Sequence, residues 1–247
     1  MDPRPAVIGC RLAGIGRLVA VTGGKGGIGK SSVSVGLALA LARAGTRTGL
    51  LDLDLWGPSD HVILGIRRPS FTEDGGLVPM RAHGITFMSI TGIVGDDAAP
   101  LRGTDVTNTI LELLAVTLWG DLDVLVVDMP PGFGDTLLDS ARYLHRAEYV
   151  VVTTPSPLVL ETSRKTIDLL RRLGLPVLGL VENLRRPGDP PISGLPGEPL
   201  PVLGTVGYDP AYESALGDPV RLGRTAFGRV MTTIAGRIRD VAGATTD

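Results

Sequence analysis

One glycine-rich segment constrains the fold of this chain more than any other feature. Gly24-Lys-Gly-Gly-Ile-Gly-Lys-Ser31 follows an apolar run and precedes a segment of helical length. It fits the pattern G-x-x-x-x-G-K-[ST], in which glycines let the backbone curl around a phosphate with its N–H groups pointing inward. The sequence therefore predicts a strand, a phosphate-binding loop and a helix in that order. The predicted nucleotide site comprises Gly24, Lys25, Gly26, Gly27, Ile28, Gly29, Lys30, Ser31 and Ser32.

The charged and hydroxyl groups of this loop suit a triphosphate. Lys30 is expected to reach the β- and γ-phosphates, and the Ser31 hydroxyl to ligate Mg²⁺. The chain has 3 lysines among its 24 basic residues, and two of them, Lys25 and Lys30, lie in the loop. Because a compact ammonium group fits where a forked guanidinium would crowd the nucleotide, this distribution supports a nucleotide site.

Apolar runs of strand length alternate with helical patterns along the chain. Strands are predicted at residues 18–21, 48–53, 85–90, 124–127, 149–152, 177–181 and 202–206, and helices at 30–44, 104–119, 158–173 and 224–241. This alternation predicts an α/β fold with three layers and a doubly wound, mostly parallel sheet. We expect one domain over residues 1–247, with residues 1–16 as an N-terminal extension. Residues 71–79 are expected to form a small insertion, and residues 184–201, rich in Pro and Gly, an irregular loop.

Composition excludes several classes of protein. Hydrophobic residues make up 43% of the chain and charged residues 20%, which is typical of a globular domain. A net charge of −2 argues against constitutive nucleic-acid binding. Cys10 is the only cysteine, which excludes a disulfide within the chain and favours a reducing, cytoplasmic setting. From the lengths of its apolar runs we expect neither a membrane-spanning segment nor a signal peptide.

Three aspartates lie where predicted strands end. Asp52 and Asp54 belong to the end of the second predicted strand, and Asp128 ends the strand at residues 124–127. Open α/β sheets bind ligands at the carboxyl ends of their strands, so these carboxylates are expected to converge on the phosphate loop. Asp128 suits Mg²⁺ binding, Asp52 would support the metal shell, and Asp54 would orient the attacking water. The alternative for each is a loop cap.

Lys25, the additional lysine of the loop, points to a known protein family. Gly-Lys-Gly-Gly-x-Gly-Lys-[ST] resembles the deviant Walker A loop of the MinD/ParA/Mrp ATPases. The resemblance implies that Lys25 acts on the ATP of a partner across a nucleotide-sandwich homodimer. It also implies slow, dimer-dependent ATP hydrolysis. The alternative is a solvated lysine on a loop.

Further motifs resemble the Mrp/ApbC branch, the iron–sulfur cluster carriers. They are Leu51-Asp-Leu-Asp-Leu-Trp-Gly-Pro-Ser59, Arg102-Gly103, Trp119-Gly-Asp-Leu-Asp-Val-Leu-Val-Val-Asp-Met-Pro-Pro-Gly-Phe-Gly-Asp135, Val152-Thr-Thr-Pro155 and Val177-Leu-Gly-Leu-Val-Glu-Asn183. The resemblance places Asp54 in switch I and the turn at residues 130–134 in switch II. It implies that Asn183 reads adenine and that the segment around Pro210 closes over the base. An asparagine has the donor and acceptor for that edge, although a loop cap is the alternative.

The sequence departs from that branch in one respect. Mrp-type proteins typically carry Cys-x-x-Cys shortly after the segment matched by Asn183, so that two protomers present four thiolates to a [4Fe–4S] cluster. Here Leu184-Arg-Arg-Pro-Gly follows, without cysteine. A symmetric dimer would supply two Cys10 thiolates, which puts the cluster in doubt, whereas none of the predicted ATPase residues is lost. A cluster held with a partner's ligands stays open.

The last predicted helix has two interpretations. Phe227, Val230, Met231, Ile234, Ile238 and Val241 recur at helical spacing, with arginines between them. Such a stripe packs on a sheet or lies on a membrane surface, and its modest apolar bulk favours the sheet.

Three outputs of the predicted Mg-ATP switch remain open. The first is iron–sulfur cluster assembly or transfer, and the second is spatial organisation of the ParA/MinD kind without a metal cluster. The third is regulation of an unidentified client protein.

Overall fold

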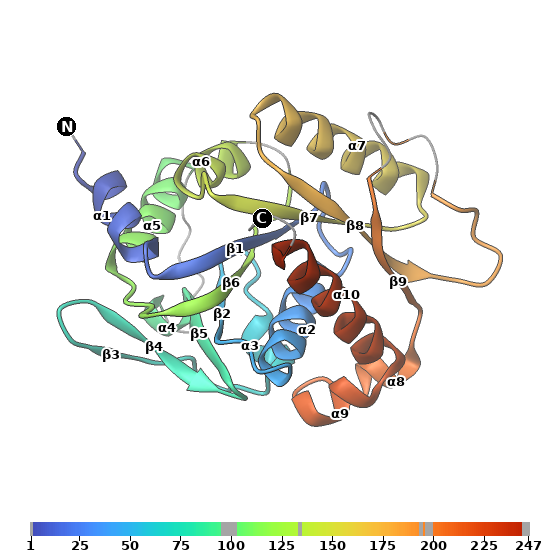
Figure 1. Cartoon of the computed structure of the whole chain (residues 1–247), viewed down its shortest axis with the longest axis horizontal. Coiled ribbons are helices and arrows are strands. Elements are labelled where there is room, and N and C mark those ends of the chain that lie inside the picture. Colours follow the sequence, from blue (N-terminus) through green and yellow to red (C-terminus); the bar gives the residue numbers. More distant parts are fainter. Residues whose placement is uncertain (1, 95–102, 133–134, 193–194, 196–199, 244–247) are drawn as a thin grey trace.

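The computed structural model describes the chain except for residues 1, 95–102, 133–134, 193–194, 196–199 and 244–247. Within the described residues one sheet of nine strands has the order β3-β4-β5-β2-β6-β1-β7-β8-β9 (Figure 1). The strands are β1 (Ile15–Thr22), β2 (Thr48–Asp52), β3 (Phe71–Glu73), β4 (Leu77–Ala82), β5 (Ile85–Ser89), β6 (Leu122–Asp128), β7 (Ala147–Thr153), β8 (Val177–Arg185) and β9 (Val202–Gly207). All neighbours from β5 to β9 pair in parallel, whereas β3 and β4 pair antiparallel. The predicted α/β fold with a mostly parallel sheet is confirmed.

The central strands are buried on both faces, which is why their sequences read as continuous apolar runs. In β1, Val19 and Val21 pack into the core on one face, while Leu18 and Ala20 pack into the core on the other. The register pairs Val21 with Asp128 of β6, so the carboxyl ends of these strands meet at one edge. The loop that follows β1 therefore begins beside Asp128.

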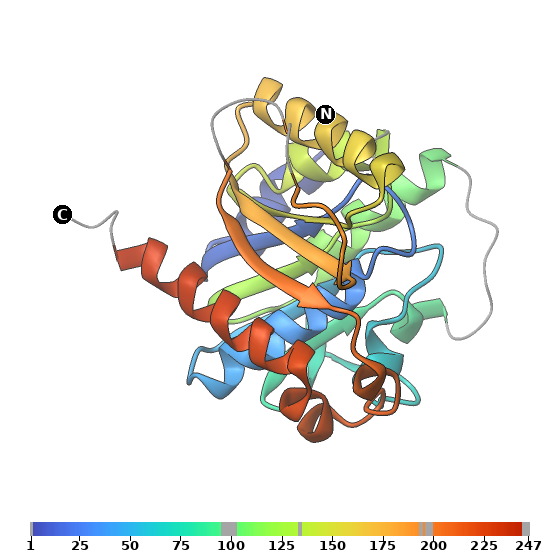
Figure 2. The same cartoon turned by 90° about the vertical axis from the view of Figure 1, so that its right-hand side faces the viewer.

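Helices cover both faces of the sheet, giving three layers (Figure 2). One face carries α2 (Lys30–Arg43), α3 (Asp60–Ile63), α8 (Pro210–Glu213), α9 (Pro219–Arg224) and α10 (Ala226–Gly243). The other carries α1 (Arg4–Leu12), α5 (Gly103–Val116), α6 (Asp135–Tyr143) and α7 (Pro157–Arg172). The short α4 (Thr91–Val94) follows β5.

Helix α2 lies between the sheet and α10. Every residue from Val33 to Leu41 is buried, because the helix is covered on both sides. A Cβ atom at Gly36 would lie 2.6 Å from Cγ of Met231 and 2.7 Å from Cε1 of Phe227, both in α10. Glycine therefore permits the close approach of these two helices.

The apolar stripe of α10 is buried. Phe227, Met231, Ile234 and Ile238 are all at most 3% exposed and belong to the core beside α2. The interpretation as a packed helix is confirmed, and the side chain of Val241 lies outside the described residues. No described helix combines the length and apolar character needed to cross a membrane.

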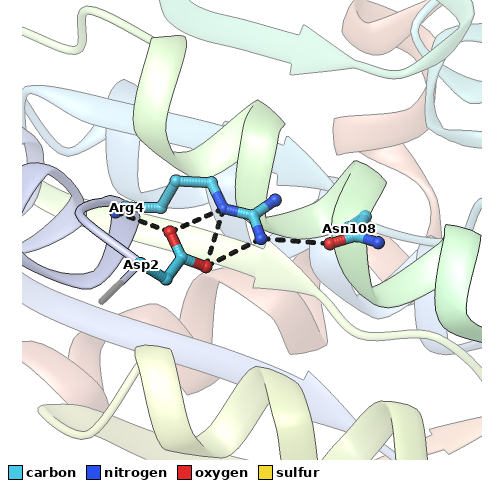
Figure 3. A network of polar contacts seen from close by, with 3 residues as sticks. All are labelled: Asp2, Arg4 and Asn108. Carbon is cyan, nitrogen blue, oxygen red and sulfur yellow. Dashed lines mark hydrogen bonds and ion pairs between the residues drawn. The ribbon is translucent and has the colours of Figure 1, made fainter.

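Helix α1 is fastened to α5 by a polar network (Figure 3). The Arg4 guanidinium donates to both carboxylate oxygens of Asp2, at 3.0 and 2.7 Å, and to Oδ1 of Asn108 in α5 at 3.1 Å. The hydrogen bond from Arg4 lowers the pKa of Asp2. Because this ion pair is partly exposed, it stabilises the contact between α1 and α5 only modestly. The buried side chains of Ile8 and Leu12 provide the apolar packing of α1.

Several elements differ from the sequence-based expectations. The predicted insertion at residues 71–79 belongs to an antiparallel hairpin, β3–β4, at the sheet edge. The helix predicted to run to Trp119 ends at Val116, because Thr117 bridges Leu77 and the Leu118 N–H donates to the Leu77 carbonyl at 2.8 Å. This helix begins at Gly103, and the side chains of its predicted caps, Thr104 and Asp105, lie outside the described residues. The last predicted helix is divided, with Arg224 ending α9 and Ala226 beginning α10.

Candidate functional site

The glycine-rich loop joins β1 to α2 in the predicted order. Gly27 and Gly29 have positive φ values of 75° and 86°, a backbone region that favours glycine. Gly29 is the N-cap of α2, and a Cβ atom there would lie 2.1 Å from Nδ2 of Asn183. Glycine is therefore required at position 29 both by its φ value and by the close approach of β8.

Asn183 connects the end of β8 to this loop. Its side chain is buried, and its Nδ2 donates to the Ile28 carbonyl at 2.9 Å. The structure thus brings the predicted base-reading residue to the loop from a strand more than 150 positions away in the chain. The amide orders the loop in addition to any contact with a base.

Asp128 lies under the first turn of α2. Its Oδ2 accepts a hydrogen bond of 2.7 Å from the Ser31 hydroxyl, and its Oδ1 accepts one of 2.8 Å from Ser34. Burial raises the pKa of Asp128 from 3.8 to about 6, while the two serines and the charge of Lys30 act in the opposite direction. The site thus contains a buried carboxyl group suited to a cation, directly beside the loop serine.

Asp52 is the neighbour of Asp128 in the sheet. The register of β2 and β6 pairs the two residues, so their side chains leave the sheet at the same level. The Asp54 N–H donates to one carboxylate oxygen of Asp52 at 3.0 Å, and the Ser89 hydroxyl donates to the other at 3.2 Å. Burial, followed by the charge of Asp128, raises the pKa of Asp52 well above its ordinary value.

Asp54 occupies the loop after β2. Its Oδ1 accepts hydrogen bonds from the N–H groups of Trp56 at 3.2 Å and Gly57 at 3.1 Å. These bonds form a turn that fixes the carboxylate, which lines the same cleft as Lys30. A carboxylate held in this way can orient a water molecule.

Asp60 is a residue of this cluster that the sequence interpretation missed. It begins α3 and is completely buried, and one carboxylate oxygen from each of Asp52, Asp60 and Asp128 lies within 4.8 Å of the others. Burial, then the charges of Asp128 and Asp52, raise the pKa of Asp60 well above its ordinary value. The sequence around it gave no signal of this role, and only the folded chain shows where the carboxyl group lies.

A cleft of about 440 Å³ opens above these residues, a size typical of small-ligand sites. Predicted residues that line it are Gly26, Gly27, Gly29, Lys30, Ser31, Ser32, Asp54 and Asn183. Asp52 and Asp128 lie beneath it, buried, and Gly24 and Ile28 form the buried part of the loop. Lys25 is exposed and, like Pro210, is outside the lining.

Aromatic side chains form the opposite wall. Tyr212 donates a hydrogen bond of 2.5 Å to the Ser32 hydroxyl and packs edge-on against Phe227 at 4.9 Å. Tyr208 is 58% exposed, with the Arg186 guanidinium 5.8 Å from its ring centre. The segment around Pro210 therefore contributes its neighbours Tyr208 and Tyr212 to the cleft. Tyr212 gave no sequence signal, since a single tyrosine has no motif.

Some predicted features fall on undescribed residues. Of the switch II turn at residues 130–134, Phe133 and Gly134 lie outside the described part, as does Arg102 of the Arg102-Gly103 pair. In the irregular loop predicted at residues 184–201, residues 193–194 and 196–199 are likewise outside the described part. The first two residues of this predicted loop, Leu184 and Arg185, belong to β8, which ends at Arg185.

Cys10 lies far from this site. It is exposed in the last turn of α1, which leads into the amino end of β1, whereas the loop follows the carboxyl end. An eight-residue strand spans roughly 23 Å. The thiol of Cys10 therefore lies at the amino end of β1, whereas the loop and the aspartates lie at the carboxyl ends of the strands.

The arrangement can bind a phosphorylated ligand with a hard cation. A left-handed glycine loop, a helix N-terminus and buried Lys30 provide positive charge for phosphates. Ser31, Asp128 and Asp52 present only oxygen atoms, the donors that Mg²⁺ prefers. The fold and this loop define a P-loop nucleotide-binding protein.

Comparison with known proteins gives the family. A family model described as "ParA: NUBPL iron-transfer P-loop NTPase" matches residues 14–190. The chain belongs to this family of P-loop NTPases. The resemblance to the MinD/ParA-type ATPases and their Mrp branch is thereby confirmed.

Individual relatives agree with this assignment. An iron–sulfur cluster carrier protein of Pseudomonas fragi is 46% identical over 178 residues, covering 70% of this chain and 62% of that protein. One of the same name from Deinococcus radiodurans is 36% identical over 92% of this chain and 71% of its own length. The chain spans about half the length of other relatives with this name, 48% in Escherichia coli K12.

Solved structures share the fold. A nucleotide-binding protein of Archaeoglobus fulgidus, in complex with ADP and with Co found by PIXE, has a TM-score of 0.67 and 30% identity and covers 92% of both chains. The Pyrococcus furiosus cell division ATPase MinD has a TM-score of 0.67 at 21% identity, covering 92% of this chain and 99% of that one.

Proposed function

We propose that this chain is a Mg-ATP-dependent switch of the Mrp type that hydrolyses ATP slowly as a homodimer. One observation carries the proposal: Ser31 of the phosphate loop bonds directly to the buried Asp128, and Lys30 and Asp54 line the cleft next to them. The groups that we propose to bind phosphate, to bind the cation and to orient water therefore lie close together.

The proposed roles follow from chemistry. Lys30 and the loop N–H groups bind the phosphates, and Asn183, Tyr208 and the segment around Pro210 surround the base. Mg²⁺, held by Ser31 and Asp128 with Asp52 behind them, would neutralise phosphate charge. Asp54 orients the water that attacks the γ-phosphorus, and the bond to the bridging oxygen breaks to give ADP and phosphate.

Lys25 is proposed to act on the partner's nucleotide. Its side chain is exposed and outside the lining of its own cleft, whereas Lys30 is 5% exposed and within it. The two lysines of one loop therefore differ in location, as expected if one serves its own subunit and the other a second copy. Hydrolysis would then depend on dimerisation.

The favoured output is iron–sulfur cluster assembly or transfer to a client protein. Relatives bearing the name iron–sulfur cluster carrier protein support this assignment. The residues of this chain do not by themselves fit a [4Fe–4S] cargo, because two copies of exposed Cys10 offer two thiolates where four are needed. A cluster would need further ligands from the client.

The second candidate is a ParA/MinD-like or other regulatory ATPase without a metal cluster. The sequence favours it in one respect, the absence of Cys-x-x-Cys after Asn183. ATP-dependent binding to DNA or anionic liposomes would support it. Failure to bind either surface would exclude the spatial-organisation version.

The decisive experiment is light scattering with a non-hydrolysable ATP analogue and with ADP, with iron assayed after anaerobic reconstitution. We expect the mass of a dimer with the analogue and of a monomer with ADP. A single-subunit mass in both, with no nucleotide bound, would refute the switch. Protein that binds no iron, alone or with a candidate client, would refute the cluster function and leave the ATPase.

A further inference from the structure

Asp60 is a buried carboxyl group without a visible partner. The residue is 0% exposed, and neither of its carboxylate oxygens has a hydrogen-bond partner among the described residues. Asp52 and Asp128, by contrast, each accept hydrogen bonds on both oxygens. A buried, unpaired carboxyl group is costly and calls for a ligand or another explanation.

The geometry around Asp60 suits one cation. Carboxylate oxygens of Asp52, Asp60 and Asp128 all lie within 4.8 Å of one another. Oxygen atoms on opposite sides of a Mg²⁺ ion are about 4.2 Å apart, and around larger divalent cations they are about 5 Å apart. The three groups come from β2, α3 and β6, so the chain folds three separate segments to place them together.

The charges around Asp60 also favour a cation. They include three carboxylates, those of Asp128, Asp52 and Asp54, and the ammonium group of Lys30. Lys30 makes no ion pair with any of them among the described contacts, and its role in the proposed function is to hold phosphate. A divalent ion bound by the three buried carboxylates would balance most of the remaining negative charge.

We propose that Asp60 completes, with Asp52 and Asp128, a three-carboxylate site that binds a hard divalent cation such as Mg²⁺ or Mn²⁺ before any nucleotide arrives. The carboxylate oxygens of Asp52 and Asp128 accept hydrogen bonds from hydroxyl and N–H groups. Each of these oxygens still has a lone pair with which it can bind the ion. Asp60 contributes a carboxylate that is otherwise unengaged. The site shares Asp52 and Asp128 with the proposed Mg²⁺ site, but it adds Asp60 and needs no ATP, and in these two respects it goes beyond the proposed function.

The test measures Mn²⁺ binding to nucleotide-free protein. Metals are first removed with EDTA, the EDTA is removed, and Mn²⁺ is then titrated while electron paramagnetic resonance measures how much of it is bound. We expect one bound Mn²⁺ per wild-type chain and an affinity weaker by roughly 10- to 100-fold in Asp60→Asn. The matched control is Asp74→Asn, which removes one exposed carboxylate in the β3–β4 turn and should bind Mn²⁺ as wild type does. An unchanged affinity in Asp60→Asn would overturn the proposal.

Two further measurements keep the test decisive. The melting temperature should rise with Mn²⁺ in wild type and Asp74→Asn but not in Asp60→Asn or Asp60→Ser, since a ligand of the native state stabilises it. Wild-type protein that binds no Mn²⁺ without nucleotide overturns the site whatever the variants do. Affinity for a fluorescent ATP analogue is measured on the same proteins in the presence of Mg²⁺. Mn²⁺ binding without nucleotide binding would leave the cation site standing and refute the ATP switch.

Discussion

The hydroxyl of Ser31 donates a 2.7 Å hydrogen bond to Oδ2 of Asp128, which joins the first turn of α2 to the carboxyl end of β6. Ser34, one turn later, bonds to the other oxygen of the same carboxylate. The carboxyl group proposed to bind the cation and the phosphate loop are therefore one connected unit, formed before a ligand binds. The predictions below depend on this unit and on the helices packed around it.

Lys30→Ala should weaken nucleotide binding by roughly 100-fold. The buried ammonium group is the loop's proposed side-chain contact for phosphate, and a charge-assisted contact of this kind is worth up to about 3 kcal/mol, or roughly 100-fold in affinity. Titration with a fluorescent ATP analogue measures the loss. Lys165→Ala is the control, because Lys165 is exposed on α7 beside Glu161. Equal affinities of the two variants would contradict the assignment of Lys30.

Lys25→Ala should retain nucleotide binding and lose hydrolysis by roughly 10³-fold, the range for a charge supplied in trans. Steady-state phosphate release measures this loss, and the specific activity of wild type should rise with protein concentration. Normal hydrolysis by Lys25→Ala would contradict the role in trans.

Mixing two inactive variants should restore activity. Asp54→Asn should bind ATP but hydrolyse it slowly, because the water is no longer oriented. In a heterodimer with Lys25→Ala, one cleft has an intact Asp54 and receives Lys25 from the Asp54→Asn subunit. Random pairing gives about one quarter of wild-type activity. A mixture no more active than its components would exclude complementation across the dimer.

Gly36→Ala should destabilise the fold. The added Cβ would lie 2.6 Å from Met231 and 2.7 Å from Phe227, so α10 must shift, at a cost of about 1–3 kcal/mol. Gly236→Ala in α10 is the matched control, since its Cβ meets nothing within 4 Å and helix propensity favours alanine. Urea denaturation should move the two midpoints in opposite directions. A Gly36→Ala midpoint at or above that of wild type would show that the helices are less tightly packed.

Stability without metal should fall as the pH rises through about 6. Burial raises the pKa of Asp128 from 3.8 to about 6, and Asp52 and Asp60 shift in the same direction. A carboxyl group whose pKa is higher in the folded state stabilises the fold below its unfolded pKa, and this contribution is lost above the folded one. In EDTA, the free energy of unfolding should decrease by a few kcal/mol between about pH 4 and pH 7, relative to Asp128→Asn. Parallel pH profiles for the two proteins would contradict the shift.

The sequence predicted those parts of the fold that depend on local pattern. β1, β6 and β7 are buried on both faces, so their apolar runs were visible without a structure. The loop was recognisable because its glycines and Lys30 occur at fixed spacing between a strand and a helix. Asp52, Asp54 and Asp128 could be proposed because parallel strands place their carboxyl ends along one edge.

The remaining features depend on tertiary contacts. β3 is three residues long and mostly exposed, so it lacks an apolar pattern. The end of α5 is set by pairing of Thr117 with Leu77, forty positions earlier in the chain. Asp60 and Tyr212 belong to the site only because α3 and α8 fold toward the loop, and neither residue type signals this from its neighbours.

The contact at Gly36 has a consequence for communication within the molecule. Helix α2 starts at the phosphate loop and is packed without a gap against α10, so it cannot tilt independently. Any movement of α2 at the phosphate loop would therefore have to be accompanied by a movement of α10, because Gly36 leaves no space between the two helices.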